Sequence, residues 1–203
     1  IINRGLLEKH IGLGNALVDM YAKCGALEKA WRVLEELPAR DVVSWNALIT
    51  GYAQLEQTQE ALECFKQMQW EGVTPDVVTY VCSLRACGSI GAIDKGQEIH
   101  EEIDRKGFLH TDIAVGTSLV DMYVKCGSLT RAQEVFDGLH DRNLVSWNAL
   151  ISGHAELGQA EEAIKCFERM QLDGVSPDGI TFVCILKGML KLRCYKRRDR
   201  NTC

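Results

Sequence analysis

The chain has 203 residues, of which 46% are hydrophobic and 25% are charged, and its formal net charge is −5 at pH 7. A hydrophobic share of this size is enough to bury a core, which excludes a disordered chain. No apolar run approaches the roughly 20 residues that cross a bilayer, so we expect a soluble protein without a membrane partner. The sequence begins at Ile1 and shows no signal or transit pattern, so we expect a piece of a longer protein.

The sequence repeats itself at a distance of 102 residues. The stretch VSWNALI occurs at residues 43–49 and again at 145–151. Residues 11–41 match 113–143 at 15 of 31 positions, and 42–76 match 144–178 at 21 of 35. Six of the nine cysteines also fall into pairs at this distance, so duplication explains their spacing and we expect free thiols.

Each copy divides into shorter units. The unit boundaries are marked by Asp41, Asp76, Asp112, Asn143 and Asp178, which are separated by 35, 36, 31 and 35 residues. These are the lengths at which one helical hairpin stacks on the next to form a solenoid. We therefore predict a helical-repeat protein.

The unit from residue 42 to residue 76 shows why each unit is expected to be a pair of helices. Its first half carries an apolar stripe at helical spacing, and its second half carries another, followed by the helix breakers Gly72 and Pro75. We expect Ser44 to cap the first helix. The two stripes are Trp45, Leu48, Ile49, Tyr52 and Ala53, and then Ala61, Cys64, Phe65 and Met68. The alternation of a β-strand is not sustained anywhere, so the fold class is predicted to be all-α.

Units of 35, 36 and 31 residues in rotation, with WNALIxG opening one unit and GVxPD closing it, resemble the pentatricopeptide repeats of plant organelles, in their PLS subclass. The resemblance implies a right-handed α-solenoid of stacked helix-turn-helix hairpins. A tetratricopeptide repeat is disfavoured because its Trp-x-x-Leu-Gly-x-x-Tyr pattern is not met and its length is constant. The implied division is 1–10 as the end of a long repeat, 11–41 short, 42–76 standard, 77–112 long, 113–143 short, 144–178 standard, 179–187 the start of a long repeat, and 188–203 a divergent basic tail.

The resemblance further implies that the fifth and last residues of each unit read one base of single-stranded RNA. The implied base-reading pairs are Asn15 with Asp41, Asn46 with Asp76, Thr117 with Asn143, and Asn148 with Asp178. In this code, Asn with Asp favours U and then C, and Thr with Asn favours A. The long units place Val81 with Asp112, and Val183, at these positions. A valine cannot form a hydrogen bond, so we expect those units to read weakly or to act as spacers.

The second residue of each unit is implied to stack on the bases. The stacking residues are Val43, Val78, Val145 and Ile180, whereas Gly12 and Ala114 are small for that role. The implied footprint in RNA is roughly U, U/C, any base, A, U/C.

Helix capping is the alternative explanation of the same polar residues, because Asn in a first turn and Asp just before it are ordinary caps. The fifth residue is polar in the short and standard units and is valine in the long units, which follows the unit type. This favours base reading.

Charge is an argument against RNA binding, since residues 1–186 hold 16 Lys and Arg against 27 Asp and Glu. Basic residues concentrate in the tail KGMLKLRCYKRRDRNTC, which has seven Lys and Arg and one Asp. This tail is expected to be unrelated sequence, with a phosphate-binding arm as the alternative.

No catalytic role, cofactor, metal site or small-molecule substrate is predicted. His100-Glu101-Glu102 matches the H-x-E of zinc deaminases, but the accompanying P-C-x-x-C is absent. The resemblance implies the recognition part of a mitochondrial or chloroplast RNA-processing or C-to-U editing factor, with editing proteins supplied in trans as further partners. The alternatives are a scaffold that binds a protein or peptide, and a truncated fragment without function.

Overall fold

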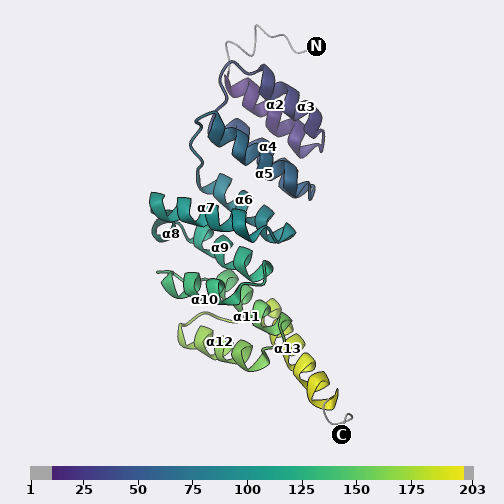
Figure 1. The fold of residues 1–203 in the computed structure, drawn as a ribbon, viewed down its shortest axis with the longest axis vertical. Coiled ribbons are helices and arrows are strands. Elements are labelled where there is room, and N and C mark those ends of the chain that lie inside the picture. The colour runs from purple at the N-terminus through teal and green to yellow at the C-terminus, as the bar shows by residue number, and fades with distance from the viewer. Residues whose placement is uncertain (1–10, 199–203) are drawn as a thin grey trace. The chain divides into compact units, whose positions relative to one another are not determined.

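The structure, a computed structural model, describes residues 11–198, apart from the side chains of His110 and of residues 192–198. The predictions for residues 1–10 and 199–203 lie outside this range. All regular elements in the described part of the chain are α-helices (Figure 1). They are α2 (Ile11–Lys23), α3 (Leu27–Glu36), α4 (Val42–Gln54), α5 (Thr58–Trp70), α6 (Val77–Ile90), α7 (Ile93–Lys106), α8 (Phe108–Thr111), α9 (Ile113–Lys125), α10 (Leu129–Gly138), α11 (Leu144–Glu156), α12 (Ala160–Leu172) and α13 (Gly179–Arg198).

The chain forms two compact units that divide between Ile90 and Gly91. In the first unit α2 packs against α3 and α4, and α4 packs against α5 and α6 (Figure 1). In the second unit α9 packs against α10 and α11, and α11 packs against α12 and α13. Within each unit, α4 and α11 thus contact both their own second helix and the first helices of the neighbouring pairs. The predicted all-α stack of hairpins is confirmed, and its right-handed sense stays a prediction.

The buried side of the standard hairpin is formed by most of the two predicted apolar stripes, whereas Tyr52 and Ala53 at the end of the first are half-buried. Trp45, Leu48 and Ile49 of α4 are at most 1% exposed, and the stripe of α5 is buried along its whole length. In the second copy, Trp147 packs edge-to-face against Phe136, with their ring centroids 4.5 Å apart. Such a contact contributes roughly 0.5–1.5 kcal/mol beyond the burial of apolar area.

Two glycines allow the first helices to approach closely. A Cβ atom on Gly51 of α4 would lie 2.8 Å from the Cβ of Ala22 in α2, and one on Gly153 of α11 would lie 2.8 Å from Val124 Cγ1 in α9. Both separations are shorter than carbon atoms in contact allow. The absence of a side chain at these positions therefore sets the distance between neighbouring first helices.

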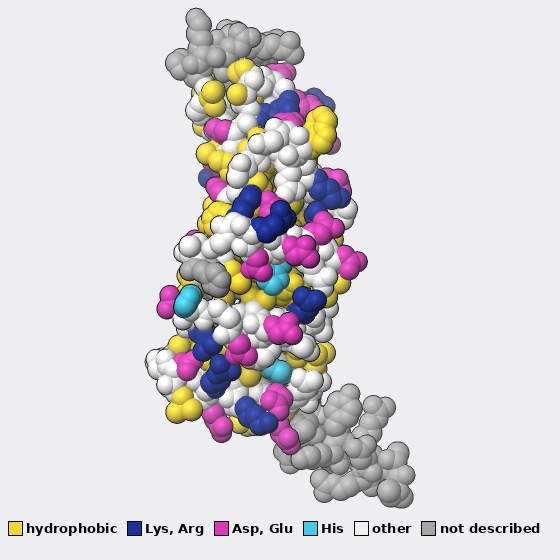
Figure 2. All heavy atoms as spheres, turned by 60° about the vertical axis from the view of Figure 1, so that its left-hand side comes forward, with side chains coloured by type: hydrophobic (Ala, Val, Ile, Leu, Met, Phe, Trp, Pro, Cys, Tyr) yellow, Lys and Arg dark blue, Asp and Glu magenta, His cyan; other side chains and the backbone are white. Residues whose placement is uncertain are grey.

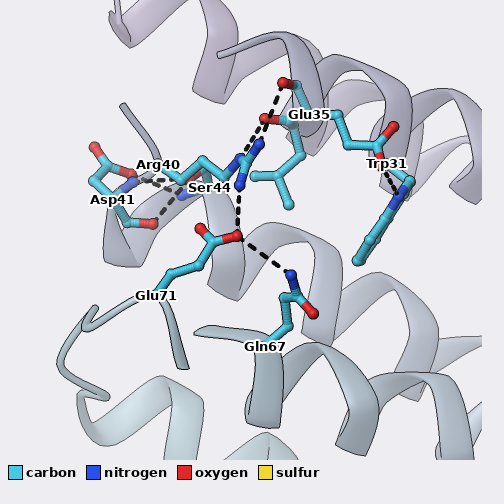
Figure 3. Close-up of polar contacts among 8 residues, drawn as sticks. Trp31, Glu35, Arg40, Asp41, Ser44, Gln67 and Glu71 are labelled. Carbon is cyan, nitrogen blue, oxygen red and sulfur yellow. Dashed lines mark hydrogen bonds and ion pairs between the residues drawn. The ribbon is translucent and has the colours of Figure 1, made fainter. Parts of the chain in front are cut away.

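The first helix of the standard unit begins at Val42, before Ser44, so the prediction of Ser44 as the cap is wrong. Asp41 is the N-cap of α4, and its side chain accepts a hydrogen bond from the Ser44 backbone N–H at 2.9 Å. The Ser44 hydroxyl accepts one from the Asp41 N–H at 3.1 Å, which completes a capping box (Figure 3). Asn143 and Ser146 form the same box at the start of α11.

An arginine ties the end of each short hairpin to the next one. Arg40 donates from Nε to the Leu34 carbonyl at 3.0 Å and pairs with Glu71 (Figure 3). Arg142 makes the equivalent contacts with the Phe136 carbonyl and with Asp173. A cation placed here donates hydrogen bonds to carbonyls that a helix end leaves unpaired, and it interacts favourably with the negative end of the helix dipole.

Helix α13 continues through the predicted junction at residue 187 without a break. In the first copy the aligned helix α6 ends at Ile90, and a turn at Gly91 follows. The side chain of Lys191 donates to the Glu156 carbonyl at the end of α11 at 2.7 Å. The described part of the basic tail is thus helical. Within the described residues, no helix is both long and apolar enough to cross a membrane.

The turn after α4 contains a residue in a costly backbone conformation. Glu56 has φ 59°, and at the same place in the second copy Gly158 has φ 74°. The left-handed region costs a residue with a side chain roughly 1–2 kcal/mol, whereas glycine adopts it readily.

We therefore expect Glu56→Gly to raise the free energy of unfolding by about 1 kcal/mol, because it removes this strain. Gly158→Glu should lower the free energy of unfolding by a similar amount. Urea unfolding followed by circular dichroism measures both changes. A Glu56→Gly protein that is less stable than the parent would show that the strain is offset by contacts of the Glu56 side chain.

Candidate nucleic-acid interface

The first standard unit brings Asn46 and Asp76 together, as the sequence predicts. Asn46 Nδ2 donates to Asp76 Oδ1 at 2.9 Å. Asp76 also begins α6, because its Oδ1 accepts from the Thr79 backbone N–H at 3.0 Å. The Thr79 hydroxyl donates to Asn46 Oδ1 at 2.6 Å. The amide of Asn46 is therefore held at both of its ends.

The second standard unit repeats this geometry. Asn148 Nδ2 donates to Asp178 Oδ1 at 3.1 Å, and the Thr181 hydroxyl donates to Asn148 Oδ1 at 2.6 Å. The Thr181 backbone N–H again donates to the carboxylate, at 2.9 Å. The same contacts thus occur in both compact units. Sequence reasoning missed Thr79 and Thr181, although a hydroxyl residue three positions after a boundary is a recognisable signal.

In the first short unit the amide is held at one end. Asn15 Nδ2 donates to both carboxylate oxygens of Asp41, at 3.1 and 2.9 Å. Asn15 Oδ1 is buried and has no hydrogen-bond partner. Ser44 occupies the position that corresponds to Thr79, but its hydroxyl donates to the Asp41 carbonyl at 2.8 Å.

The other predicted pairs are not joined by a hydrogen bond. Thr117 is only 8% exposed, and its hydroxyl is buried without a partner, while Asn143 caps α11. In the long unit Asp112 caps α9 through the backbone N–H of Ala114 at 2.8 Å, and Val81 has no polar group to offer. The structure therefore joins three pairs by hydrogen bonds, and Thr117 forms none with Asn143.

The predicted stacking residues are exposed on the first helices. Their exposed fractions are 56% for Val43, 48% for Val78, 61% for Val145 and 62% for Ile180. In the first compact unit, Val43 and Val78 line a cavity of about 240 Å³ together with Asn46. This cavity thus has an apolar side chain from each of two neighbouring units and the amide in its wall. Gly12 and Ala114 are also exposed. Val183, which is predicted to be a weak reader, is 48% exposed.

The capping carboxylates are stabilised in their charged form. Burial raises the pKa of Asp76, but hydrogen bonds from the Thr79 N–H and the Asn46 amide outweigh it and hold the pKa below its ordinary value. Asp41 behaves in the same way through Ser44 and Asn15. For Asp178 the hydrogen bond from the Thr181 N–H is the largest cause of the lowered pKa.

The lysines that end α2 and α9 form ion pairs within the protein. Lys23 pairs with Asp19 at 2.7 Å, and Lys125 pairs with Asp121 at 2.7 Å. Lys23 and Asp19 both line the cavity beside Asn46. On the face drawn in Figure 2, basic and acidic side chains are interspersed. At the cavity beside Asn46 a phosphate group would therefore meet both Lys23 and Asp19, and base contacts gain in relative weight.

The His100 motif has a structural explanation. His100 Nδ1 lies 2.9 Å from the Tyr123 hydroxyl, and Nε2 lies 3.6 Å from Asp104. These contacts hold α7 against α9. Among the residues that the structure describes, no three His, Cys, Asp or Glu side chains are grouped so that they could hold a metal ion.

Stacked hairpins that present polar pairs at unit intervals define a helical-repeat protein with a periodic face. Family comparison agrees with this description. The PPR repeat family model matches residues 40–89 and 142–191, and the PPR repeat model matches 15–42 and 117–144. Each match recurs 102 residues later. The chain belongs to the pentatricopeptide repeat family.

Its relatives include organellar proteins of Arabidopsis thaliana. A chloroplastic pentatricopeptide repeat-containing protein is 45% identical over 185 residues, which is 88% of this chain and 25% of the relative. A second chloroplastic one is 41% identical, and the match covers 91% of this chain and 30% of the relative. A putative mitochondrial one is 40% identical, and there the match covers 89% and 29%. The chain thus spans between 25% and 30% of the length of these relatives.

Solved structures show the same fold. The pentatricopeptide repeat protein PPR10 in complex with an 18-nucleotide psaJ RNA element has a TM-score of 0.70 at 21% identity, covering 86% of this chain and 27% of that one. The PPR domain of Arabidopsis thaliana protein-only RNase P 1 in complex with tRNA has a TM-score of 0.64 at 16% identity, covering 85% and 94%.

The lowered pKa values predict how acid affects stability. A carboxylate whose pKa is lower in the folded state stabilises the fold above its unfolded pKa, and this contribution is lost as the pH falls through the folded pKa. We therefore expect the parent protein to lose stability below pH 3.8, the ordinary value for Asp76. The Asp76→Asn variant should lose less stability over the same pH range, because residue 76 no longer titrates. Urea unfolding at a series of pH values measures the difference.

The matched reverse change is Asn143→Asp, which introduces a titrating carboxylate at the equivalent cap. It should steepen the loss of stability in acid. Parallel pH profiles for the parent, Asp76→Asn and Asn143→Asp would contradict this account of the caps.

Proposed function

We propose that this chain binds single-stranded RNA, with each reading hairpin contacting one base through its fifth and last residues. The observation that carries the proposal is the pair Asn46 and Asp76, which recurs with the same contacts as Asn148 and Asp178. A structural cap needs the aspartate but not the asparagine. A surface amide that is fixed in place twice at the same interval suits recognition of a regular, extended ligand.

The free hydrogen-bonding capacity of each amide suits a pyrimidine edge. An Asn side chain has two N–H donors and two acceptor lone pairs. In Asn46 one donor is used by Asp76 and one lone pair by Thr79, so one of each remains. Val43 and Val78 flank the cavity beside this amide, where they would pack against the two faces of a base. Stacking of this kind tolerates any base, so the amide supplies the selectivity.

The footprint follows from the order of the units. The pair Asn15 and Asp41 favours U, both standard units favour U and then C, and Thr117 with Asn143 favours A. The long unit, with Val81, acts as a spacer, so the expected site is roughly U, U/C, any base, A, U/C. Because the Thr117 hydroxyl is buried, we expect the A position to be the least selective of the four reading positions.

In the intact protein we assign these repeats to the recognition part of a chloroplast or mitochondrial RNA-processing or C-to-U editing factor of the PLS subclass. The rotation of 31-, 35- and 36-residue units supports the subclass, and the chloroplastic and mitochondrial relatives support the location. This chain spans only part of those relatives. The processing activity would lie in other segments or in editing proteins supplied in trans.

Binding of fluorescein-labelled 12-nucleotide RNAs, followed by anisotropy, tests the proposal. RNA that contains UUAAU should bind more tightly than poly-A. Replacing Asn46 and Asn148 together by alanine should weaken binding to the UUAAU RNA by roughly tenfold or more, since each loses hydrogen bonds of about 1 kcal/mol net.

The matched control removes two amides from the second helices. Gln69 and Gln171 are also 102 residues apart, so Gln69→Ala with Gln171→Ala deletes two equivalent amides away from the first-helix face. This control should bind as the parent does. Equal binding of the parent to all RNAs, abolished by modest salt, would contradict base reading and favour either a protein-binding scaffold or the basic tail.

A further inference from the structure

We propose that Thr79 and Thr181 determine the pyrimidine specificity of the two standard units by fixing which end of the Asn46 and Asn148 amides faces the base. This inference rests on the proposed RNA-binding function. It adds two residues that lie outside the fifth, last and second positions. Both are fully buried at the start of the following helix.

The contacts define the direction of the amide. The two ends of an Asn side chain have almost the same shape, and the hydrogen-bond network decides which is nitrogen. Asp76 can only accept, so it takes Nδ2 of Asn46. Thr79 donates its proton to Oδ1 at 2.6 Å. A rotated amide would direct its oxygen at the carboxylate, which cannot donate, so that bond would be lost. Its NH₂ would face the hydroxyl, which could accept only by turning its own proton to Asp76 Oδ1, 3.0 Å away.

Burial makes the hydroxyl contact hard to replace. Thr79 and Thr181 are each 0% exposed, so water has no access to the hydroxyl that holds the amide oxygen. The same 2.6 Å distance occurs for Thr181 and Asn148. If the contact is broken, the Thr79 hydroxyl proton must turn to Asp76 Oδ1 at 3.0 Å, an oxygen that already accepts from the Thr79 N–H, which opposes rotation of the amide.

A fixed amide distinguishes uracil from cytosine. Uracil carries a donor, N3–H, between two carbonyl oxygens, whereas cytosine carries an acceptor at N3 beside an amino donor. The remaining lone pair of Asn46 Oδ1 can accept N3–H of uracil, and the remaining Nδ2–H can donate to the adjacent carbonyl. Cytosine in the same position would place its N3 lone pair against Oδ1. It would bind well only if the amide turned over.

The short units provide an internal comparison. Ser44 and Ser146 stand at the positions of Thr79 and Thr181, yet their hydroxyls donate to the carbonyls of Asp41 and Asn143, at 2.8 and 2.9 Å. Asn15 Oδ1 accordingly has no partner. The added methyl group of threonine restricts its χ1 rotamers, whereas serine is free to choose the backbone. Standard and short units with the same Asn and Asp therefore hold the amide differently.

The test replaces both threonines by valine, which keeps the shape and removes the hydroxyl. Affinities of the full 203-residue chain are measured for two 12-nucleotide RNAs, one with UUAAU and one with UCAAC, which differ at the nucleotides assigned to the standard units. We expect the parent to prefer UUAAU. In Thr79→Val with Thr181→Val this preference should fall by about fivefold or more, the factor that corresponds to one hydrogen bond of ordinary net strength.

The control separates specificity from stability. Ser44→Ala with Ser146→Ala removes the hydroxyl from two equivalent capping boxes without removing a contact to the Asn46 or Asn148 amide. It should lower the unfolding temperature as the valine variant does, yet keep the ratio of the two affinities. A merely structural role of the threonines would lower both affinities alike and leave the ratio unchanged. If the double valine variant does not fold, Thr181→Val alone is tested with RNAs that differ only at the last nucleotide.

The outcomes distinguish this inference from the function on which it rests. If the parent prefers UUAAU and the valine variant keeps that preference within about twofold, the specificity role is overturned and RNA binding stands. If the parent binds UUAAU, UCAAC and poly-A equally, base reading is overturned and the specificity role falls with it. Loss of the preference in the valine variant, with retention in the alanine control, supports both.

Discussion

The structure depends on one contact, the hydrogen bond between the last residue of a hairpin and the start of the next helix. Asp76 accepts from the backbone of Thr79 and in doing so fixes where α6 begins. The same carboxylate oxygen accepts from Asn46, which lies 30 residues earlier in the same unit. Because helix start and amide position share one atom, the polar pair cannot move without loss of the cap. The interval between pairs is then set by helix packing, which Gly51 and Gly153 make close.

This shared atom changes how the polar residues at the boundaries are understood. Capping and base reading look like alternatives in the sequence, since either explains Asp or Asn before a helix. In the structure the cap is what orients the amide, so capping would be a condition of the base reading that we propose. The lowered pKa of Asp76 has the same origin, as its hydrogen bonds serve both the helix and the amide. A unit whose fifth residue cannot reach the cap, such as the one with Thr117, keeps the cap alone.

The repeat period could be predicted from the duplication in the sequence, and the helical pairs could be predicted from the spacing of apolar residues. The pairing of Asn46 with Asp76 could be predicted only through the family resemblance. Other features depend on geometry that a sequence does not contain. Ser44 and Asp41 are both good caps, and only the backbone shows that Asp41 begins the helix. The contact of Thr79 with Asn46 spans 33 residues and depends on how two helices pack. The burial of Thr117 has the same kind of cause.

The charge of the chain gives the fixed amides their importance. With a net charge of −5, and with Lys23 and Lys125 paired to neighbouring aspartates, the protein has little attraction for a phosphate backbone. Affinity for RNA would then come from base contacts and stacking, which gain most when the reading groups are already in position. Asn46 and Asn148 meet that condition in the free protein, since each is held at both ends before any ligand arrives. A repeat protein with a net negative charge can be selective for this reason, because little of its binding is independent of sequence.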